Sequence, residues 1–119
     1  MHKLMPDEVL VVMAGKFQML ADPTRLAILR TLMFEGKRKV GQVVEATGGT
    51  QANISKHLKL LAAAGLLARR KEGLNVLYRL DDPVVEKICH LVCGTIMEEM
   101  EAQAEKSRKP PKRKGSKRK

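Results

Sequence analysis

The chain has 119 residues, two cysteines and a formal net charge of +10. No apolar stretch approaches the roughly 18 residues needed to cross a bilayer, and the N-terminus lacks the layout of a secretion signal. Two cysteines fit a reduced compartment better than a disulfide framework, so we expect a single-domain protein of the cytoplasm. Nine of the 23 Lys and Arg residues lie in 106–119, which leaves 14 basic against 13 acidic residues for 1–105.

The first two helices are predicted over residues 7–20 and from Pro23 to about Met33. Asp22-Pro23 supplies an N-cap and a proline at the first helical position, where its missing N–H costs nothing. Residues 35–39 read as a basic turn. The apolar positions of the first helix fall on one side: Val9, Leu10, Met13, Phe17 and Leu20.

The most informative stretch runs from Thr50 to Leu67 and follows a short predicted helix, 40–47, and the break Gly48-Gly49. Ile54, Leu58 and Leu61 recur at i, i+4 and i+7, the spacing of one helix face. Thr50 is placed to cap the helix and Gly65 to end it. The other face carries amide, hydroxyl and ammonium groups and no carboxylate, as contact with DNA requires. This pattern predicts a helix-turn-helix.

Residues 66–80 alternate with period two around the turn Glu72-Gly73-Leu74-Asn75, which predicts a short basic hairpin. Asp82-Pro83 repeats the cap signal and opens a last helix to about Ala104. The predicted fold is mainly α with a small β-hairpin, a winged helix-turn-helix of order α-α-α-α-β-β-α. Residues 1–105 would form its DNA-binding and dimerisation domain, and 106–119 a disordered basic tail.

Four segments together resemble the ArsR/SmtB family of winged-helix transcriptional repressors, which sense metals, metalloids or thiol-reactive species. They cover about residues 8–104: Leu20-Ala-Asp-Pro-Thr-Arg-Leu-Ala-Ile-Leu-Arg30, Ile54-Ser-Lys-His-Leu-Lys-Leu-Leu61, Ala64-Gly-Leu-Leu67 and Val76-Leu-Tyr-Arg-Leu80. The resemblance implies a homodimer built on the first and last helices that binds an inverted repeat in double-stranded DNA and is released by an effector. The family's two common metal-site patterns are absent here, at residues 38–42 and across residues 81–97.

The predicted DNA contacts lie on the polar helix and the hairpin. Gln and Asn can pair with adenine, while Lys, Arg and Ser more often bind phosphate. Not all hairpin residues can face DNA, because strand neighbours alternate. His57 lies beside the apolar row, where it would only support the backbone contact. The full set is Thr50, Gln51, Asn53, Ser55, Lys56, His57, Lys59, Arg69, Arg70, Lys71, Asn75 and Arg79.

Cys89 and Cys93 are the candidate effector site, because an i, i+4 pair places both thiols on one helix face. Such a pair can hold a soft metal(loid) ion or undergo redox chemistry across a dimer. Met97 is expected to pack rather than bind. The competing interpretation is that both cysteines are small apolar core residues, and the sequence does not choose between them.

The sequence therefore predicts a sequence-specific DNA-binding regulator, most simply a repressor, and not an enzyme. Two alternatives stay open: a nonspecific architectural DNA-binding protein that uses the basic tail, and a regulator of the same type with no metal effector. A catalyst is disfavoured because no nucleophile–base pair or phosphate-cradling loop stands out.

Overall fold

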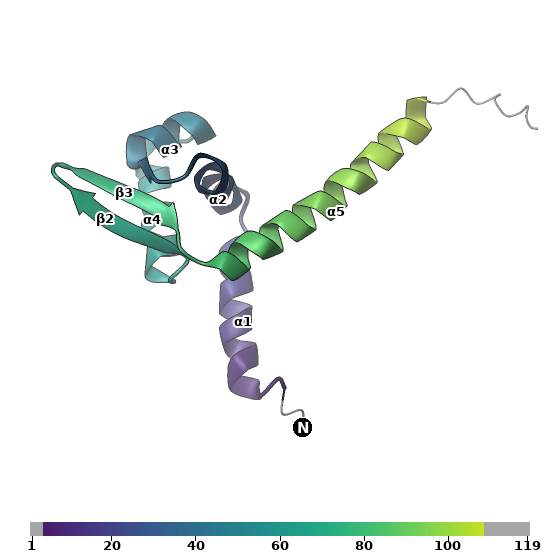
Figure 1. Ribbon diagram of the computed structural model, residues 1–119, viewed down its shortest axis with the longest axis horizontal. Coiled ribbons are helices and arrows are strands. Elements are labelled where there is room, and N and C mark those ends of the chain that lie inside the picture. Colours follow the sequence, from purple (N-terminus) through teal and green to yellow (C-terminus); the bar gives the residue numbers. More distant parts are fainter. Residues whose placement is uncertain (1–3, 109–119) are drawn as a thin grey trace, which may run out of the picture. The chain divides into compact units, whose positions relative to one another are not determined.

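The computed structural model describes residues 4–108, and the chain divides into two compact units after Pro83 (Figure 1). The first unit contains α1 (Asp7–Leu20), α2 (Pro23–Glu35), β1 (Arg38–Lys39), α3 (Val40–Thr47), α4 (Gln51–Ala63), β2 (Leu67–Glu72) and β3 (Asn75–Leu80). The second unit is formed by α5 (Pro83–Arg108) from Val84 onward. The predicted winged helix-turn-helix is confirmed, with one strand more than expected.

The start of α2 follows from its sequence. The Asp22 carboxylate accepts a hydrogen bond from the backbone N–H of Arg25 at 3.0 Å, and Pro23 occupies the first turn. This backbone hydrogen bond, helped by the nearby Arg25 charge, lowers the pKa of Asp22 although desolvation opposes the shift. The helix ends at Gly36, whose φ of 80° suits a residue without a side chain and whose N–H donates to Leu32 O.

The core of the first unit brings one face of each of three helices against the sheet. The predicted apolar row of α4, Ile54, Leu58 and Leu61, is fully buried, which confirms the spacing argument. The side chains that complete this core come from α2, α3, the α4–β2 link and the hairpin: Ile28, Leu29, Leu32, Val43, Leu66, Leu67 and Tyr78.

The sheet has three antiparallel strands in the order β1-β3-β2, and its first strand corrects the sequence interpretation. Arg38 and Lys39, expected in a turn, pair with Tyr78 and Leu77 of β3. Two residues are too few for a period-two pattern, so only the partner strand defines them. At the base of the hairpin the N–H of Asp81 donates to Leu66 O at 2.9 Å, which joins the link between β3 and α5 to the link between α4 and β2.

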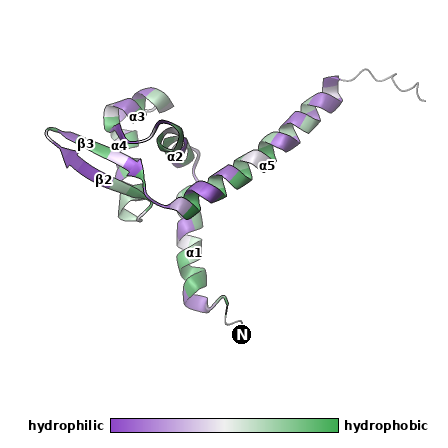
Figure 2. Cartoon of the chain, viewed as in Figure 1, coloured by the Kyte–Doolittle hydropathy of each residue, from purple (hydrophilic) through white to green (hydrophobic). Residues whose placement is uncertain are grey.

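Helix α1 carries a large exposed apolar surface, visible as its green bands in Figure 2. Within α1, all of which the structure describes, no residue is buried, and Val11 and Val12 are 73% and 67% exposed. A polar contact of α1 is made by Lys16, whose ammonium lies 2.7 Å from the Asp82 carboxylate. The Asp82 side chain in this ion pair is largely shielded from solvent. Exposed apolar surface of this kind marks a binding face.

Helix α5 ends at Arg108, past the predicted end near Ala104, so residues 106–108 are helical rather than part of a disordered tail. The ion pair between Arg108 and Glu105 and the cations in the last turn favour this extension, because they oppose the negative end of the helix dipole. Residues 109–119 lie outside the described residues. Among residues 4–108, no helix is long and apolar enough to span a bilayer.

Candidate nucleic-acid interface

The turn between α3 and α4 is fixed by two glycines and a cap. Gly48 ends α3 with a left-handed φ of 76° and donates to Val44 O. Thr50 then caps α4, its Oγ1 accepting from the N–H of Asn53 at 3.2 Å. A Cβ built on Gly49 would lie 2.9 Å from both Cγ1 and Cδ1 of Ile54, so only glycine lets the turn approach α4 this closely.

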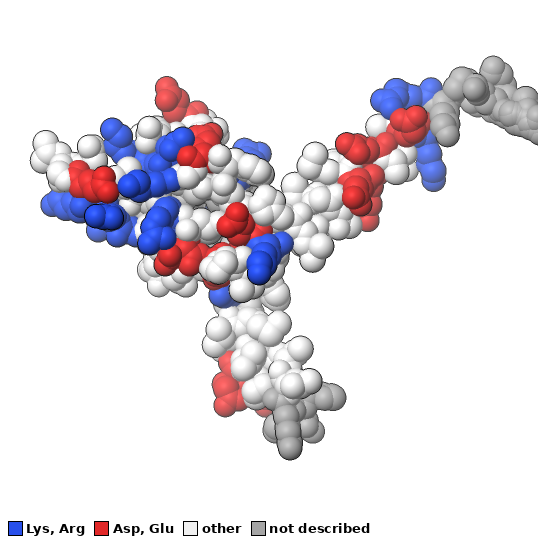
Figure 3. Space-filling model, viewed as in Figure 1, with Lys and Arg blue, Asp and Glu red and all other residues white. Residues whose placement is uncertain are grey.

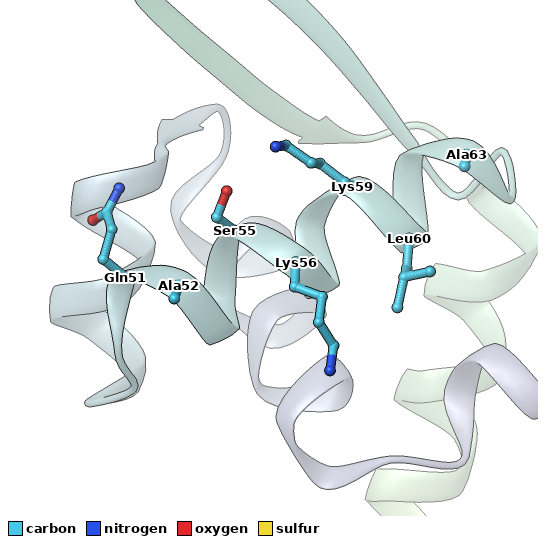
Figure 4. Close-up of a pocket in the computed structure, with 7 residues that line it drawn as sticks. All are labelled: Gln51, Ala52, Ser55, Lys56, Lys59, Leu60 and Ala63. Atoms are coloured by element: carbon cyan, nitrogen blue, oxygen red, sulfur yellow. The ribbon is translucent and has the colours of Figure 1, made fainter.

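The exposed face of α4 presents donors in two neighbouring rows (Figure 4). Gln51, Ser55 and Lys59 point to one side, while Lys56 and Leu60 point to the other. These residues line a shallow surface hollow together with Ala52 and Ala63. No carboxylate lies between residues 51 and 63, so the whole face can donate hydrogen bonds to phosphates and base edges.

Ala52 and Leu60 are functional candidates that the polar pattern overlooked. Both lie among the donors on the exposed face, and Leu60 is 40% exposed. Apolar side chains in this setting contact the methyl group of thymine. The signal was present in the sequence, since both residues fall outside the buried row defined by Ile54, Leu58 and Leu61.

His57 does not fit a direct DNA contact, because its side chain is only 9% exposed. Its Nδ1 lies 3.4 Å from Nη1 of Arg25, and the same guanidinium donates to Met19 O and Gln18 O at the end of α1. His57 falls at i+3 from Ile54, a spacing that belongs to the buried face. Arg25, which sequence reasoning did not single out, is therefore the polar link between α1 and α4.

The β2–β3 register divides the predicted hairpin contacts between two faces of the sheet. Directly opposed residues of an antiparallel pair share a face. Arg69 opposes Tyr78 and Lys71 opposes Val76, whereas Arg70 opposes Leu77 and Arg79 opposes Ala68. Asn75, opposite Glu72, belongs with the second set. The expectation that the hairpin residues could not all face one way is thus met.

The hairpin is basic but not uniformly free to bind anions. Lys and Arg side chains gather over the hairpin in the space-filling view (Figure 3). Glu72 near its tip interacts with Lys37 and Arg70, at 3.4 and 3.5 Å, and Arg79 pairs with Asp81 at 2.8 Å. These pairs are exposed and therefore weak. Phosphate can replace the carboxylates as partner, and Arg69 and Lys71 have no ion pair among the described residues.

The two thiols lie on α5 as predicted, and neither is fully buried within the described residues of one chain. Cys93 is exposed and Cys89 is half-buried. Burial, with a smaller contribution from Cys93, raises the pKa of the Cys89 thiol, so it carries its proton at neutral pH. Within residues 4–108, no group of three or more His, Cys, Asp or Glu side chains could hold a metal ion. Residues 4–108 of one chain therefore do not form a zinc site of four such ligands.

Comparison with known proteins places this arrangement in a family. A model described as "Helix-turn-helix domain" matches residues 20–70. The HTH-type transcriptional repressor SmtB of Mycobacterium tuberculosis is 36% identical over 91 residues, which are 76% of this chain and 64% of that protein. The arsenical resistance operon repressor of Bacillus subtilis is 36% identical over 88 residues, which are 70% of this chain and 84% of that one.

A solved structure agrees with these relatives. The homodimeric winged helix-turn-helix DNA-binding domain of a possible ArsR-family regulator from Mycobacterium bovis superimposes with a TM-score of 0.71 and 32% identity. The match covers 80% of this chain and 87% of that domain. Both sequence relatives are named as transcriptional repressors rather than enzymes. On these similarities in sequence and fold, this chain belongs to the ArsR/SmtB family of winged-helix transcriptional regulators.

Proposed function

We propose that the protein is a sequence-specific DNA-binding repressor that acts as a homodimer in the cytoplasm. The observation that carries the proposal is the carboxylate-free exposed face of α4, held by the Thr50 cap and the Gly49 turn beside a basic hairpin. In helix-turn-helix proteins this second helix enters the major groove. The remaining predicted contacts divide into base readers, Gln51 and Asn53, and phosphate binders on α4 and the wing.

The experiment is selection of binding sites from a random duplex library with the full chain, followed by titration of the selected duplex against a scrambled one. An inverted repeat with half-sites about one helical turn, or a multiple, apart is expected. The same titration with a chain ending at Arg108, which keeps all of α5, tests the architectural alternative. If site preference disappears with residues 109–119, the basic tail and not the α4 face supplies binding.

The homodimer is supported by the apolar surfaces of α1 and α5. Leu10 is 43% and Phe17 49% exposed on α1, while Val92 and Ile96 are 50% and 46% exposed on α5. A monomer rarely leaves such helices uncovered, and a two-fold dimer would match an inverted repeat. The substitution Leu10→Lys should shift the chain from dimer toward monomer, which sedimentation equilibrium measures. Glu8→Lys, in the polar first turn of the same helix, is the control and should leave the dimer intact.

The proposed effector is a soft metal(loid) ion or a thiol-reactive species that acts at Cys89 and Cys93. Support comes from the exposure of Cys93, the i, i+4 spacing of the thiols, and the relative named for arsenical resistance. Effector binding on α5 would weaken DNA binding. Addition of As(III) or a polysulfide to the protein–DNA complex, followed by gel shift, tests this step. Continued release of DNA from the Cys89→Ser, Cys93→Ser double variant would rule out the thiols.

A further inference from the structure

Three sulfur atoms lie one turn apart along α5, at Cys89, Cys93 and Met97, and we call this row the sulfur stripe. The i, i+4 spacing places successive members on one helix face. The thiol of Cys93 donates to the thioether sulfur of Met97 across 3.7 Å. Met97 is 55% exposed, so its side chain is not packed inside the described residues of one chain.

The distance between the two sulfur atoms suits one bound ion. A sulfur ligand lies about 2.3 Å from a metal such as zinc, so two sulfurs on one ion are at most about 4.6 Å apart. The Cys93–Met97 separation of 3.7 Å is already within that range. Cys89 and Met97 are eight positions apart, or about 12 Å of helix rise. One ion cannot therefore take all three sulfurs from one chain, and Cys93–Met97 is the pair in place.

The ligand types select the ion. A thiolate and a thioether are both soft donors and favour Cu(I) among biological metals. Zinc would require four ligands, and trivalent arsenic binds thiolates rather than thioethers. One thiolate with one neutral thioether also balances a single positive charge. We propose that Cys93 and Met97 form a Cu(I) site on α5.

This inference rests on the proposed function, because it takes one thiol of the proposed effector site, Cys93, and names the ion that this thiol binds together with Met97. Binding is a ligand exchange without redox change: the Cys93 thiol loses its proton to solvent as its sulfur bonds to Cu(I), and Met97 adds its neutral sulfur. Cys89 lies one turn before Cys93 on the same helix face. Cu(I) and a thiol-bridging species therefore compete for the same Cys93 sulfur.

The test is an anaerobic titration of the full chain with Cu(I) in competition with a chromophoric Cu(I) chelator, with no DNA present. Cys93→Ser should abolish binding. Met97→Leu keeps the size of the side chain without its sulfur and should weaken binding by about tenfold or more, a loss that even an outer-shell partner can cause. Met100→Leu is the matched control: Met100 is 66% exposed and about 10 Å of helix rise from Cys93, so wild-type affinity is expected.

The outcomes separate this site from the proposed function. Equal affinity of Met97→Leu and the wild type, or an equal loss in Met100→Leu, overturns the Cys93–Met97 site. Circular dichroism of each variant shows whether the helical fold is kept, and these exposed positions on α5 are expected to tolerate the changes. A wild-type chain that binds Cu(I) but selects no DNA site would contradict the repressor function and leave the copper site standing.

Discussion

Nη1 of Arg25 lies 3.4 Å from Nδ1 of His57, while the rest of the same guanidinium holds the last carbonyls of α1. One side chain thus connects the proposed dimer helix to the buried side of the recognition helix, α4. Because a guanidinium can only donate hydrogen bonds, Nδ1 is the acceptor side of this contact. The exposed face of α4 keeps its orientation through a contact on its opposite side.

Arg25→Met is expected to lower the free energy of unfolding by about 1–3 kcal/mol, because it leaves partly buried acceptors unsatisfied. DNA affinity should fall with the stability, but the slope of log affinity against log salt should not change, because Arg25 holds protein groups rather than phosphate. Urea unfolding and salt-dependent DNA titration measure the two quantities. Arg30→Met, exposed on the same helix, is the control for lost charge. A shallower salt slope in Arg25→Met would mean that Arg25 touches the DNA backbone.

Gly49→Ala should destabilise the helix-turn-helix, because the new methyl group would meet the fully buried Ile54 side chain at 2.9 Å. Overpacking of this kind costs about 1–3 kcal/mol. Gly41→Ala is the opposite case: no described atom lies within 4 Å of its added Cβ, and alanine favours a helix by about 1 kcal/mol over glycine. The urea midpoints of the two variants should move in opposite directions. Equal midpoints would show that Ile54 moves aside without cost.

Lys59→Ala and Gln51→Ala should affect DNA binding in different ways, although both residues lie on the same side of α4. Loss of a phosphate-binding lysine should weaken all duplexes alike and reduce the salt slope by about one. Loss of a base-reading glutamine should leave the salt slope unchanged. It should relax the base preference at one position of each half-site, with a loss of about 1–3 kcal/mol in discrimination against the wrong base. Titration of the selected duplex and its single-base variants, at several salt concentrations, distinguishes the two. The reverse pattern would exchange the two assignments.

The stability of the protein should depend on Asp22 at acid pH. The hydrogen bond from Arg25 N–H lowers the pKa of this carboxyl below its usual 3.8. A lowered pKa stabilises the folded state above the unfolded value of about 4, and this contribution disappears as pH falls through the folded value. Asp22→Asn keeps a capping oxygen without the charge. Its urea midpoint between about pH 5 and pH 2 should therefore fall less steeply than that of the wild type.

The sequence predicted what local pattern and cap chemistry determine. The buried row of α4, the Thr50 cap, the glycine break and the hairpin turn all follow from spacing and residue type, and all four are found. The third strand is different, because Arg38 and Lys39 have no pattern of their own and become a strand only beside β3. The extension of α5 carries a local i, i+3 ion pair between Arg108 and Glu105, a spacing that the sequence did contain.

Only part of the candidate site could likewise be predicted from local sequence patterns. Helical periodicity placed Gln51, Ser55 and Lys59 on the exposed face, and it also contained the signal that His57 lies on the buried face. The Arg25–His57 contact joins residues 32 positions apart, which no local rule predicts. The contact between Cys93 and Met97 is local, but the sequence gives only their i, i+4 spacing, and the exposure of Met97 depends on what surrounds α5.

The hydrogen bond from Asp81 N to Leu66 O has a consequence for the design of variants. It closes the hairpin at its base, so the residues that enter and leave the hairpin lie side by side. At the other end the hairpin turns at Gly73 and Leu74, and Leu74 is fully exposed. Because Leu67 and Tyr78 belong to the core and β3 pairs with β1, we expect that only the part of the hairpin around this turn can be changed in length or charge without displacing the end of α4. The tip of the wing is therefore the part whose reach along DNA can be altered separately from base recognition.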